Sequence, residues 1–168
     1  MLLSDKVAVI YGARGAIGGA VARAFAEEGA QVFATGREVD ALDEQAIDRH
    51  LQSVIDAAGR VDISFDAIGV PDSNVVGVPL VDMDFDRFAL PIAAYTTSYF
   101  LTARLAARRM AAQGSGVIMT ATPLLARIGA PLLGGYSPAM AAKDARRVHA
   151  GDCLTFLFEN FETVRYQI

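Results

Sequence analysis

The chain has 168 residues, enough for one domain of ordinary size but too few for two. Hydrophobic residues make up 53% of the chain and charged residues only 20%, a composition that excludes an intrinsically disordered protein. The net charge of −4 has the wrong sign for a nucleic-acid-binding protein, and the longest uncharged stretch, residues 88–103, is too short to span a bilayer.

The first part of the chain predicts a strand, a helix and a second strand. Residues 6–11 and 31–35 are short apolar runs typical of buried parallel strands. Residues 16–28 between them carry an apolar stripe with helical spacing, and Gly29 ends it. The stripe consists of Ile17, Ala20, Val21, Ala24 and Phe25. Together the three elements predict a βαβ unit, in which the two strands run parallel.

The alternation of helices and strands continues to the end of the chain. In order, the pattern predicts a helix at residues 43–58, a strand at 61–65, a surface loop at 70–80, a long helix at 84–112, a strand at 116–121, a loop at 122–135, a helix beginning near Tyr136 or Ser137, and a fifth strand at 153–158. Gly59 ends the helix at residues 43–58, and Gly114 ends the helix at residues 84–112. Pro91 is expected to break or bend the second of these helices. This order indicates an α/β fold with a doubly wound, mostly parallel sheet.

A glycine-rich turn joins the first strand to the first helix. Gly12, Gly15 and Gly18 stand in this turn. Glycine permits a tight turn and lets backbone N–H groups approach a pyrophosphate at the positive N-terminus of a helix. The turn therefore predicts a dinucleotide-binding site, with a purely structural turn as the alternative interpretation.

The end of the second strand indicates which dinucleotide is bound. A carboxylate at this point would accept hydrogen bonds from the ribose 2′-hydroxyl of NAD. The sequence instead has Thr35, Gly36 and Arg37, and the Arg37 guanidinium suits the 2′-phosphate of NADP. Arg14 is a second cation for the same phosphate. These residues favour NADP over NAD, and an Arg37 that is merely solvated is the alternative.

Three segments carry a family resemblance, namely residues 9–18, 62–69 and 135–140. They resemble the short-chain dehydrogenase/reductase family, and the resemblance covers residues 5–142. It implies a Rossmann-like fold in a single truncated domain, in which residues 1–142 bind the dinucleotide. Residues 143–168 are expected to be a divergent tail that completes the sheet. The family's glycines stand first, fifth and seventh in the turn, whereas here Ala16 takes the fifth position.

The resemblance also indicates residues outside the turn that would bind the dinucleotide. The family has an Asn-Asn-Ala-Gly stretch near the adenosine, which residues 66–69 match in position. Only its glycine, Gly69, is identical in this chain. Asp40 resembles the family's aspartate that contacts adenine. Together with the turn and the two arginines, the expected cofactor-binding residues are Gly12, Arg14, Gly15, Ala16, Ile17, Gly18, Arg37, Asp40, Ala67, Ile68 and Gly69.

The resemblance implies a catalytic set that is incomplete in this chain. Tyr136 matches the tyrosine that exchanges a proton with the substrate, but Met140 stands where the family has the lysine that lowers the pKa of that tyrosine. The serine position falls on Pro123, so Thr122 beside it is the hydroxyl left to polarise a carbonyl. The asparagine position falls near Tyr95. Tyr136 and Thr122 are the expected catalytic residues, and a Tyr136 that only packs on the sheet is the alternative.

Lys143 lies farther along the helix that begins with Tyr136. Seven residues of helix rise about 10.5 Å, compared with about 6 Å for four residues. We therefore expect that Lys143 does not replace the missing lysine.

The chain is shorter than the family after the second strand. Between Arg37 and Asp40 the family has another helix and most of a third strand. Because a crossover to a parallel strand needs about a dozen residues or more, we expect no strand beyond the second one and an open adenine side of the cofactor pocket. The tail after Lys143 no longer resembles the family, and it is similar to an unrelated, uncharacterised family of small bacterial proteins.

Metal binding, disulfides and export are not expected. His50, His149 and the single Cys153 show no metal-ligand spacing, and one cysteine cannot form an internal disulfide. The first residues lack the basic start and the long apolar run of a signal peptide. We therefore expect a cytoplasmic protein.

Three functions are consistent with the sequence. The first is an NADP-dependent oxidoreductase that acts on a carbonyl or alcohol through Tyr136 and Thr122. The second is a catalytically inactive dinucleotide-binding or scaffold protein. The third is an incomplete fold stabilised by self-association. In the resembled family the long helix and the tyrosine-bearing helix form oligomer interfaces, which implies a homo-oligomer. The resemblance also implies a small-molecule substrate. The charge and the short uncharged stretch indicate that the protein binds neither nucleic acid nor a membrane.

Overall fold

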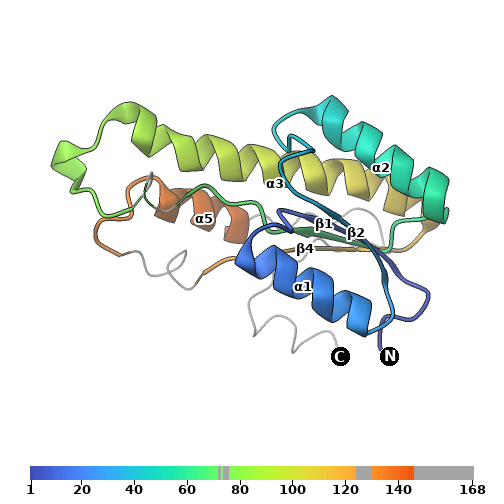
Figure 1. Cartoon of the computed structure of the whole chain (residues 1–168). Coiled ribbons are helices and arrows are strands. Elements are labelled where there is room, and N and C mark those ends of the chain that lie inside the picture. The colour runs from blue at the N-terminus through green and yellow to red at the C-terminus, as the bar shows by residue number, and fades with distance from the viewer. Residues whose placement is uncertain (72, 74–75, 124–129, 146–168) are drawn as a thin grey trace.

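A parallel sheet forms the centre of the protein (Figure 1). The computed structural model describes residues 1–71, 73, 76–123 and 130–145. Within these residues the strands are β1 (Val7–Tyr11), β2 (Gln31–Thr35), β3 (Ile63–Asp66) and β4 (Val117–Thr120). Their order is β2-β1-β3-β4, and every neighbouring pair is parallel. The sheet confirms the predicted α/β fold.

Helices cover both faces of the sheet. They are α1 (Ala16–Glu27), α2 (Glu44–Ala58), α3 (Phe85–Gln113) and α5 (Tyr136–Ala145), with η2 (Leu80–Asp82) as a short 3₁₀ turn before α3. α1 lies on one face, α2 and α3 lie on the other, and α5 packs along α3 (Figure 1). The predicted order of elements is confirmed up to α5, whereas the strand predicted at residues 153–158 lies outside the described residues.

Polar and glycine residues mark where the two long helices begin and end. The Asp43 carboxylate accepts a hydrogen bond from the Gln45 N–H (2.8 Å) and so caps the start of α2. Gly59 ends α2 with φ at 78°, a left-handed conformation that favours glycine. Asp84 and Gly114 have the same roles at the two ends of α3. Local sequence signals therefore set the bounds of both helices.

The larger part of the core lies between the sheet and the α2–α3 face. Ile47, Leu51 and Val54 are fully buried in α2, as their helical spacing predicts. They pack in one cluster with the β1 side chains Val7 and Val9, the α3 side chains Leu105 and Met110, and Ile118 of β4. Burial of a side chain of this size stabilises the fold by about 1.5–3 kcal/mol.

The opposite face, which carries α1, is covered less completely. Of the predicted apolar stripe, Ile17 is 60% exposed, Ala20 and Ala24 are also exposed, and only Val21 and Phe25 are half-buried. The residue of α1 that is buried is Gly18. α1 has no neighbouring helix on this face within the described residues (Figure 1). Three of the five side chains of the stripe are therefore exposed.

Pro91 lies inside α3 without interrupting it. Proline lacks an N–H group and cannot donate the usual hydrogen bond to the fourth residue before it, yet α3 runs through Pro91 as one element of 29 residues. The helix is therefore not broken at Pro91, and a bend there stays a prediction. Pro91 is buried. In the described part of the chain, no helix combines the length and the apolar character that crossing a membrane requires.

The segment between β2 and α2 is short. It comprises residues 36–43, and no strand of the described residues lies beyond β2 in the sheet. Among the described residues β2 is therefore the edge strand of the sheet. These eight residues are too few to form a crossover helix and return to the sheet as an outer strand.

We expect Leu51→Ala to lower the free energy of unfolding by about 2–5 kcal/mol, because truncation leaves a cavity in the cluster between α2 and the sheet. Urea denaturation measures this loss. The matched control is Leu80→Ala, since Leu80 is 74% exposed, and its effect should stay within about 0.5 kcal/mol. Equal losses for the two variants would contradict the placement of Leu51 in the core.

Candidate functional site

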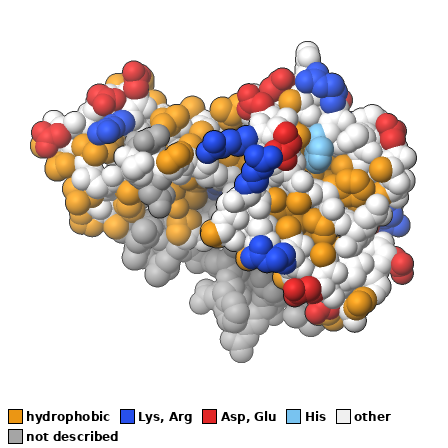
Figure 2. Space-filling view, in the orientation of Figure 1, with side chains coloured by type: hydrophobic (Ala, Val, Ile, Leu, Met, Phe, Trp, Pro, Cys, Tyr) orange, Lys and Arg blue, Asp and Glu red, His pale blue; other side chains and the backbone are white. Residues whose placement is uncertain are grey.

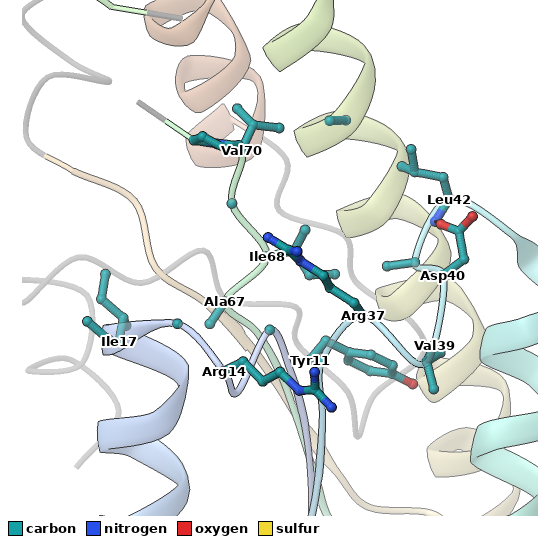
Figure 3. Close-up of a pocket in the computed structure, with 18 residues that line it drawn as sticks. Tyr11, Arg14, Ile17, Arg37, Val39, Asp40, Leu42, Ala67, Ile68 and Val70 are labelled. Atoms are coloured by element: carbon teal, nitrogen blue, oxygen red, sulfur yellow. The ribbon is translucent and has the colours of Figure 1, made fainter. Parts of the chain in front are cut away.

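A cavity of about 780 Å³ lies at the carboxyl ends of β1, β2 and β3 (Figure 3). The turn after β1, the segment after β2 and the segment after β3 form its walls. Its lining includes Gly12, Arg14, Gly15, Ala16, Ile17, Arg37, Asp40, Ala67, Ile68 and Gly69. The structure therefore brings together every residue of the expected cofactor-binding set except Gly18, which is buried at the start of α1.

Close backbone contacts hold the turn after β1 in place. Gly12 has φ at 76°, and a Cβ atom there would come within 2.5 Å of the Ala67 carbonyl oxygen. A Cβ atom on Gly18 would come within 2.5 Å of the Gly12 carbonyl oxygen. These two glycines allow the turn to lie directly against both the end of β3 and the start of α1.

The start of α1 forms one end of the cavity. Gly15 is the N-cap residue, and no side chain accepts a hydrogen bond from the N–H groups of the first turn. Ala16 and Ile17, the first two residues of the helix, line the cavity. Because the first N–H groups of a helix have no partner within it and carry partial positive charge, this end of the cavity suits an anion such as a phosphate.

Two arginines reach the cavity, and one of them is paired. The Arg14 guanidinium forms an ion pair with the Glu38 carboxylate at 3.2 Å. The Gly36 N–H donates to Glu38 (2.5 Å), and this bond together with Arg14 holds the pKa of Glu38 below its usual value. Arg37 is exposed and has no ion-pair partner among the described residues. Basic and acidic side chains lie side by side near the middle of the face in Figure 2.

Sequence reasoning missed Glu38, although it directly follows Arg37. The expectation of two free cations considered only residues 35–37 and Arg14. The ion pair leaves one of the two arginines, Arg37, without a counter-ion among the described residues.

The segment after β2 forms one wall of the cavity. Val39, Asp40, Ala41 and Leu42 all line the cavity. The Asp40 carboxylate accepts a hydrogen bond from the Leu42 N–H (2.9 Å), which gives the segment a tight turn. Val39 and Ala41 pack against the core that contains Tyr11. The short segment thus supplies part of the cavity wall beside the end of β2. The open adenine side of the cofactor pocket stays a prediction.

Tyr11 is a second residue that sequence reasoning did not single out. It is the last residue of β1, is 1% exposed and lines the cavity. Its hydroxyl has no hydrogen-bond partner in the described part of the protein. The one available signal was a bulky tyrosine directly before the first glycine of the turn.

The two expected catalytic residues do not line the cavity. Tyr136 is half-buried at the start of α5, and its ring lies edge-on to that of Tyr95, with centroids 5.7 Å apart. Thr122 is half-buried two residues after the end of β4. Met140, at the position of the family's lysine, is buried in an apolar cluster with Tyr95 and Ala139. The catalytic roles of Tyr136 and Thr122 stay predictions.

A buried ion pair joins α5 to the end of β3. The Lys143 ammonium lies 3.9 Å from the Asp66 carboxylate, and both side chains are almost completely buried. It also lies 5.7 Å from the ring centroids of Tyr95 and Tyr99. Burial raises the pKa of Asp66 and lowers that of Lys143, and each charge partly opposes the shift of the other. Sequence reasoning considered Lys143 only as a partner of Tyr136 and missed Asp66.

Metal ligands do not gather in the described residues. No group of three or more His, Cys, Asp or Glu side chains there could hold a metal ion. The cavity chemistry of the described residues is therefore that of backbone N–H groups, two guanidinium groups, the Asp40 carboxylate and uncharged side chains.

Sequence comparison identifies the family. A profile described as Enoyl-(Acyl carrier protein) reductase matches residues 34–146, about two thirds of the chain. A relative named short-chain dehydrogenase reductase 5, from Arabidopsis thaliana, is 26% identical over 150 residues, covering 77% of this chain and 57% of the relative. The chain belongs to the short-chain dehydrogenase/reductase family.

Other relatives in this family are named dehydrogenases. Cis-4-hydroxycyclohexanecarboxylate dehydrogenase of Sinomonas cyclohexanicum is 27% identical over 159 residues, covering 82% of this chain and 63% of the relative. L-rhamnose 1-dehydrogenase (NAD(P)(+)) of Azotobacter vinelandii is 25% identical over 168 residues, covering 84% and 64%. The chain spans less than two thirds of the length of these relatives.

The fold also matches a solved structure. The crystal structure of NAD+-bound xylitol dehydrogenase superposes with a TM-score of 0.78 at 24% identity, covering 86% of this chain and 63% of that one. This likeness confirms the Rossmann-like fold. A second sequence profile, described as a protein of unknown function, matches residues 136–168, most of which lie outside the described residues.

We expect Lys143→Met to lower the free energy of unfolding by about 3–5 kcal/mol near neutral pH, because it leaves the Asp66 carboxylate buried without a counter-charge. Folding of this variant raises the pKa of Asp66, so its folded state binds a proton that the unfolded state has lost. Its stability should therefore fall as the pH rises above the ordinary carboxyl pKa of about 4, which urea denaturation at each pH measures.

The matched control is the double variant Asp66→Asn with Lys143→Met, which removes both charges. It should recover most of the lost stability and lose the added pH dependence. A single variant as stable as the wild type at every pH would contradict the buried pair.

Proposed function

We propose that the cavity binds NADP through the phosphate-binding turn, the start of α1 and Arg37. The observation that carries this proposal is the cavity itself, because its walls are formed by the residues of the expected cofactor-binding set. Gly12 and Gly18 leave no room for a Cβ atom, so the turn lies tightly against the end of β3 and the start of α1, as the phosphate-binding turn of this fold requires. The name of the Azotobacter relative, which includes NAD(P)(+), supports a nicotinamide dinucleotide as the ligand.

The preference for NADP over NAD rests on Arg37. Its guanidinium has no partner among the described residues, and Figure 3 shows it extending over the cavity from the segment after β2. A guanidinium binds a phosphate through two parallel hydrogen bonds. Arg14 contributes less to this preference, because the Glu38 carboxylate already neutralises it.

We propose further that the whole protein is an oxidoreductase that acts on a carbonyl or alcohol. The dinucleotide supplies the hydride chemistry when it is bound. Tyr136 would exchange the proton with the substrate oxygen, and Thr122 would donate a hydrogen bond to that oxygen. Family membership and the names of the dehydrogenase relatives support this proposal.

One observation favours a protein that binds the dinucleotide without turning over a substrate. Met140 is 2% exposed and packs against Tyr95 and Ala139, so the family's lysine position is part of an apolar cluster. An uncharged side chain there cannot lower the pKa of Tyr136. A catalytically inactive dinucleotide-binding or scaffold protein is therefore the second candidate function.

We also propose that the chain forms a homo-oligomer. Large apolar side chains are exposed on η2 and the beginning of α3, namely Leu80, Val81, Phe85 and Leu90. Hydrophobic side chains gather at the left end of the face shown in Figure 2, where Figure 1 places η2 and the start of α3. An exposed apolar patch of this kind is typical of an interface between protein subunits.

We expect Arg37→Ala to weaken NADPH binding roughly ten- to hundredfold, the loss of a charged hydrogen bond worth about 1.5–3 kcal/mol, with little change for NADH. Titration calorimetry of each variant with NADPH and NADH measures the preference. Glu38→Gln should have the opposite effect and tighten NADPH binding roughly two- to fivefold, because it frees Arg14. An Arg37→Ala variant that kept the wild-type preference would contradict the assignment of NADP.

The two candidate functions differ in turnover. If the protein is an oxidoreductase, NADPH is oxidised in the presence of a member of a carbonyl panel, and Tyr136→Phe abolishes this activity because the phenol no longer transfers a proton. Absorbance at the nicotinamide band measures the rate. Saturable NADPH binding without turnover of any panel member would instead support the inactive binding protein. Wild-type turnover by Tyr136→Phe would contradict the role of this tyrosine.

A further inference from the structure

The Glu38 carboxylate lies at the rim of the cavity between two residues of its wall. One carboxylate oxygen accepts a hydrogen bond from the Gly36 N–H (2.5 Å), and the other forms the ion pair with the Arg14 guanidinium (3.2 Å). Gly36 and Arg14 both line the cavity, and the Glu38 side chain is 49% exposed. The carboxylate is therefore within reach of a ligand in the cavity, and both of its oxygens are bonded to groups that such a ligand could use.

The two donors are held in fixed positions. The Ala13 N–H donates to the Thr35 carbonyl (2.9 Å) and so joins the turn after β1 to the end of β2. The stem of Arg14 crosses Gly36 closely, because a Cβ atom on residue 36 would come within 2.7 Å of the Arg14 Cγ and Cδ atoms. The absence of a side chain at Gly36 therefore lets the guanidinium and the Gly36 N–H reach the same carboxylate.

The groups around this carboxylate are those of an anion site. The pKa of Glu38 lies below its usual value, mainly because the N–H groups of Gly36 and of Glu38 itself hydrogen-bond to the charged form. The nearby Thr35 hydroxyl and the Arg14 guanidinium lower it further. The Thr35 side chain is 3% exposed, and its hydroxyl oxygen has no well-formed hydrogen bond within the described residues. Two backbone N–H groups, a hydroxyl and a guanidinium thus favour a negative charge at this position.

The contacts of Glu38 are of a kind that a ligand can replace. The Arg14 side chain is 73% exposed, and an ion pair at such an exposed position contributes little to stability. A phosphate monoester carries a charge of about −1.5 to −2 at neutral pH and three acceptor oxygens, more than a carboxylate offers. Arg37 also lines the cavity and has no ion-pair partner among the described residues; Figure 3 shows both arginines reaching the cavity. A phosphate at this position therefore gains Arg37 in addition to the donors that Glu38 uses.

We propose that the Glu38 carboxylate occupies the site of the 2′-phosphate in the free protein and is displaced when NADP binds, which makes Glu38 a specificity-determining residue. This inference rests on the proposed binding of NADP and goes beyond it, because it assigns the 2′-phosphate site an occupant of its own. NAD has a hydroxyl in place of the 2′-phosphate, so it binds with Glu38 still in place. Because NADP has to break the contacts of Glu38, its advantage over NAD is smaller than the two arginines alone would give.

The test compares Glu38→Ala with Glu38→Gln. Alanine empties the site, whereas glutamine loses the charge but keeps an oxygen that can accept the Gly36 N–H. Displacement predicts that the Kd for NADPH falls roughly five- to twentyfold in Glu38→Ala, more than the roughly two- to fivefold expected for Glu38→Gln. An effect of the charge alone would be equal in the two variants. Titration calorimetry gives the Kd values, and thermal melting checks that both variants are folded.

Adenosine 2′,5′-bisphosphate and adenosine 5′-monophosphate are matched probes, because they differ only in the 2′-phosphate. Glu38→Ala should tighten binding of the bisphosphate by the same factor as binding of NADPH. It should change the Kd of the monophosphate and of NADH by less than about twofold. Glu27→Ala is the control variant, since it removes a carboxylate from the last residue of α1, which does not line the cavity. Its Kd for all four ligands should equal that of the wild type.

Equal gains for Glu38→Ala and Glu38→Gln, or equal gains for the bisphosphate and the monophosphate, would overturn the inference while the binding of NADP stands. Unchanged or weaker binding of NADPH by Glu38→Ala would overturn it as well, because Glu38 would then not compete with the phosphate. If the wild type and both Glu38 variants bind neither NADPH nor the bisphosphate, the proposed function itself is overturned.

Discussion

The close approach of two backbone turns is the constraint on which the cavity depends. The turn after β1 meets the segment after β3 at Gly12 and Ala67, where a Cβ atom on residue 12 would come within 2.5 Å of a carbonyl oxygen. The Ala67 N–H donates to the Tyr11 carbonyl (3.0 Å) and locks the two segments together. Gly18 lets α1 begin directly behind this contact. As a result, the start of α1, whose first N–H groups have no partner within the helix, lies at the cavity wall.

Polar groups that are buried and poorly satisfied are concentrated near this constraint. Asp66, whose pKa is raised by burial, directly precedes the cavity-lining residue Ala67, and Tyr11 directly precedes Gly12. Tyr11 also belongs to the core between α2 and the sheet, whose other members include the aliphatic side chains Ile47 and Leu51. Unsatisfied buried groups reduce stability, so the position of these two at one edge of the sheet favours a functional site there.

Local sequence signals made the fold predictable, whereas pairings between residues far apart in the sequence could not be predicted. Helix bounds followed from Asp43 and Gly59, which act within a few residues of themselves. The ion pairs of Arg14 with Glu38 and of Asp66 with Lys143 join residues that are distant in sequence. The spacing of apolar residues along the chain does not predict such pairs. The cofactor-binding set was found because most of it lies in turns that directly follow strands. The exposure of the α1 stripe was missed, because spacing shows that a face is apolar but not whether a neighbour covers it.

The short segment after β2 shows how a cavity can be walled at the edge of a sheet. β2 is the last strand on this side among the described residues. Here Val39 and Ala41 pack onto the core around Tyr11, and Asp40 stabilises the turn between them through the Leu42 N–H. Few buried residues are needed, because the segment has to cover only one end of the cavity. The same short segment carries Glu38, which pairs with Arg14 at 3.2 Å and so reduces the positive charge at the cavity.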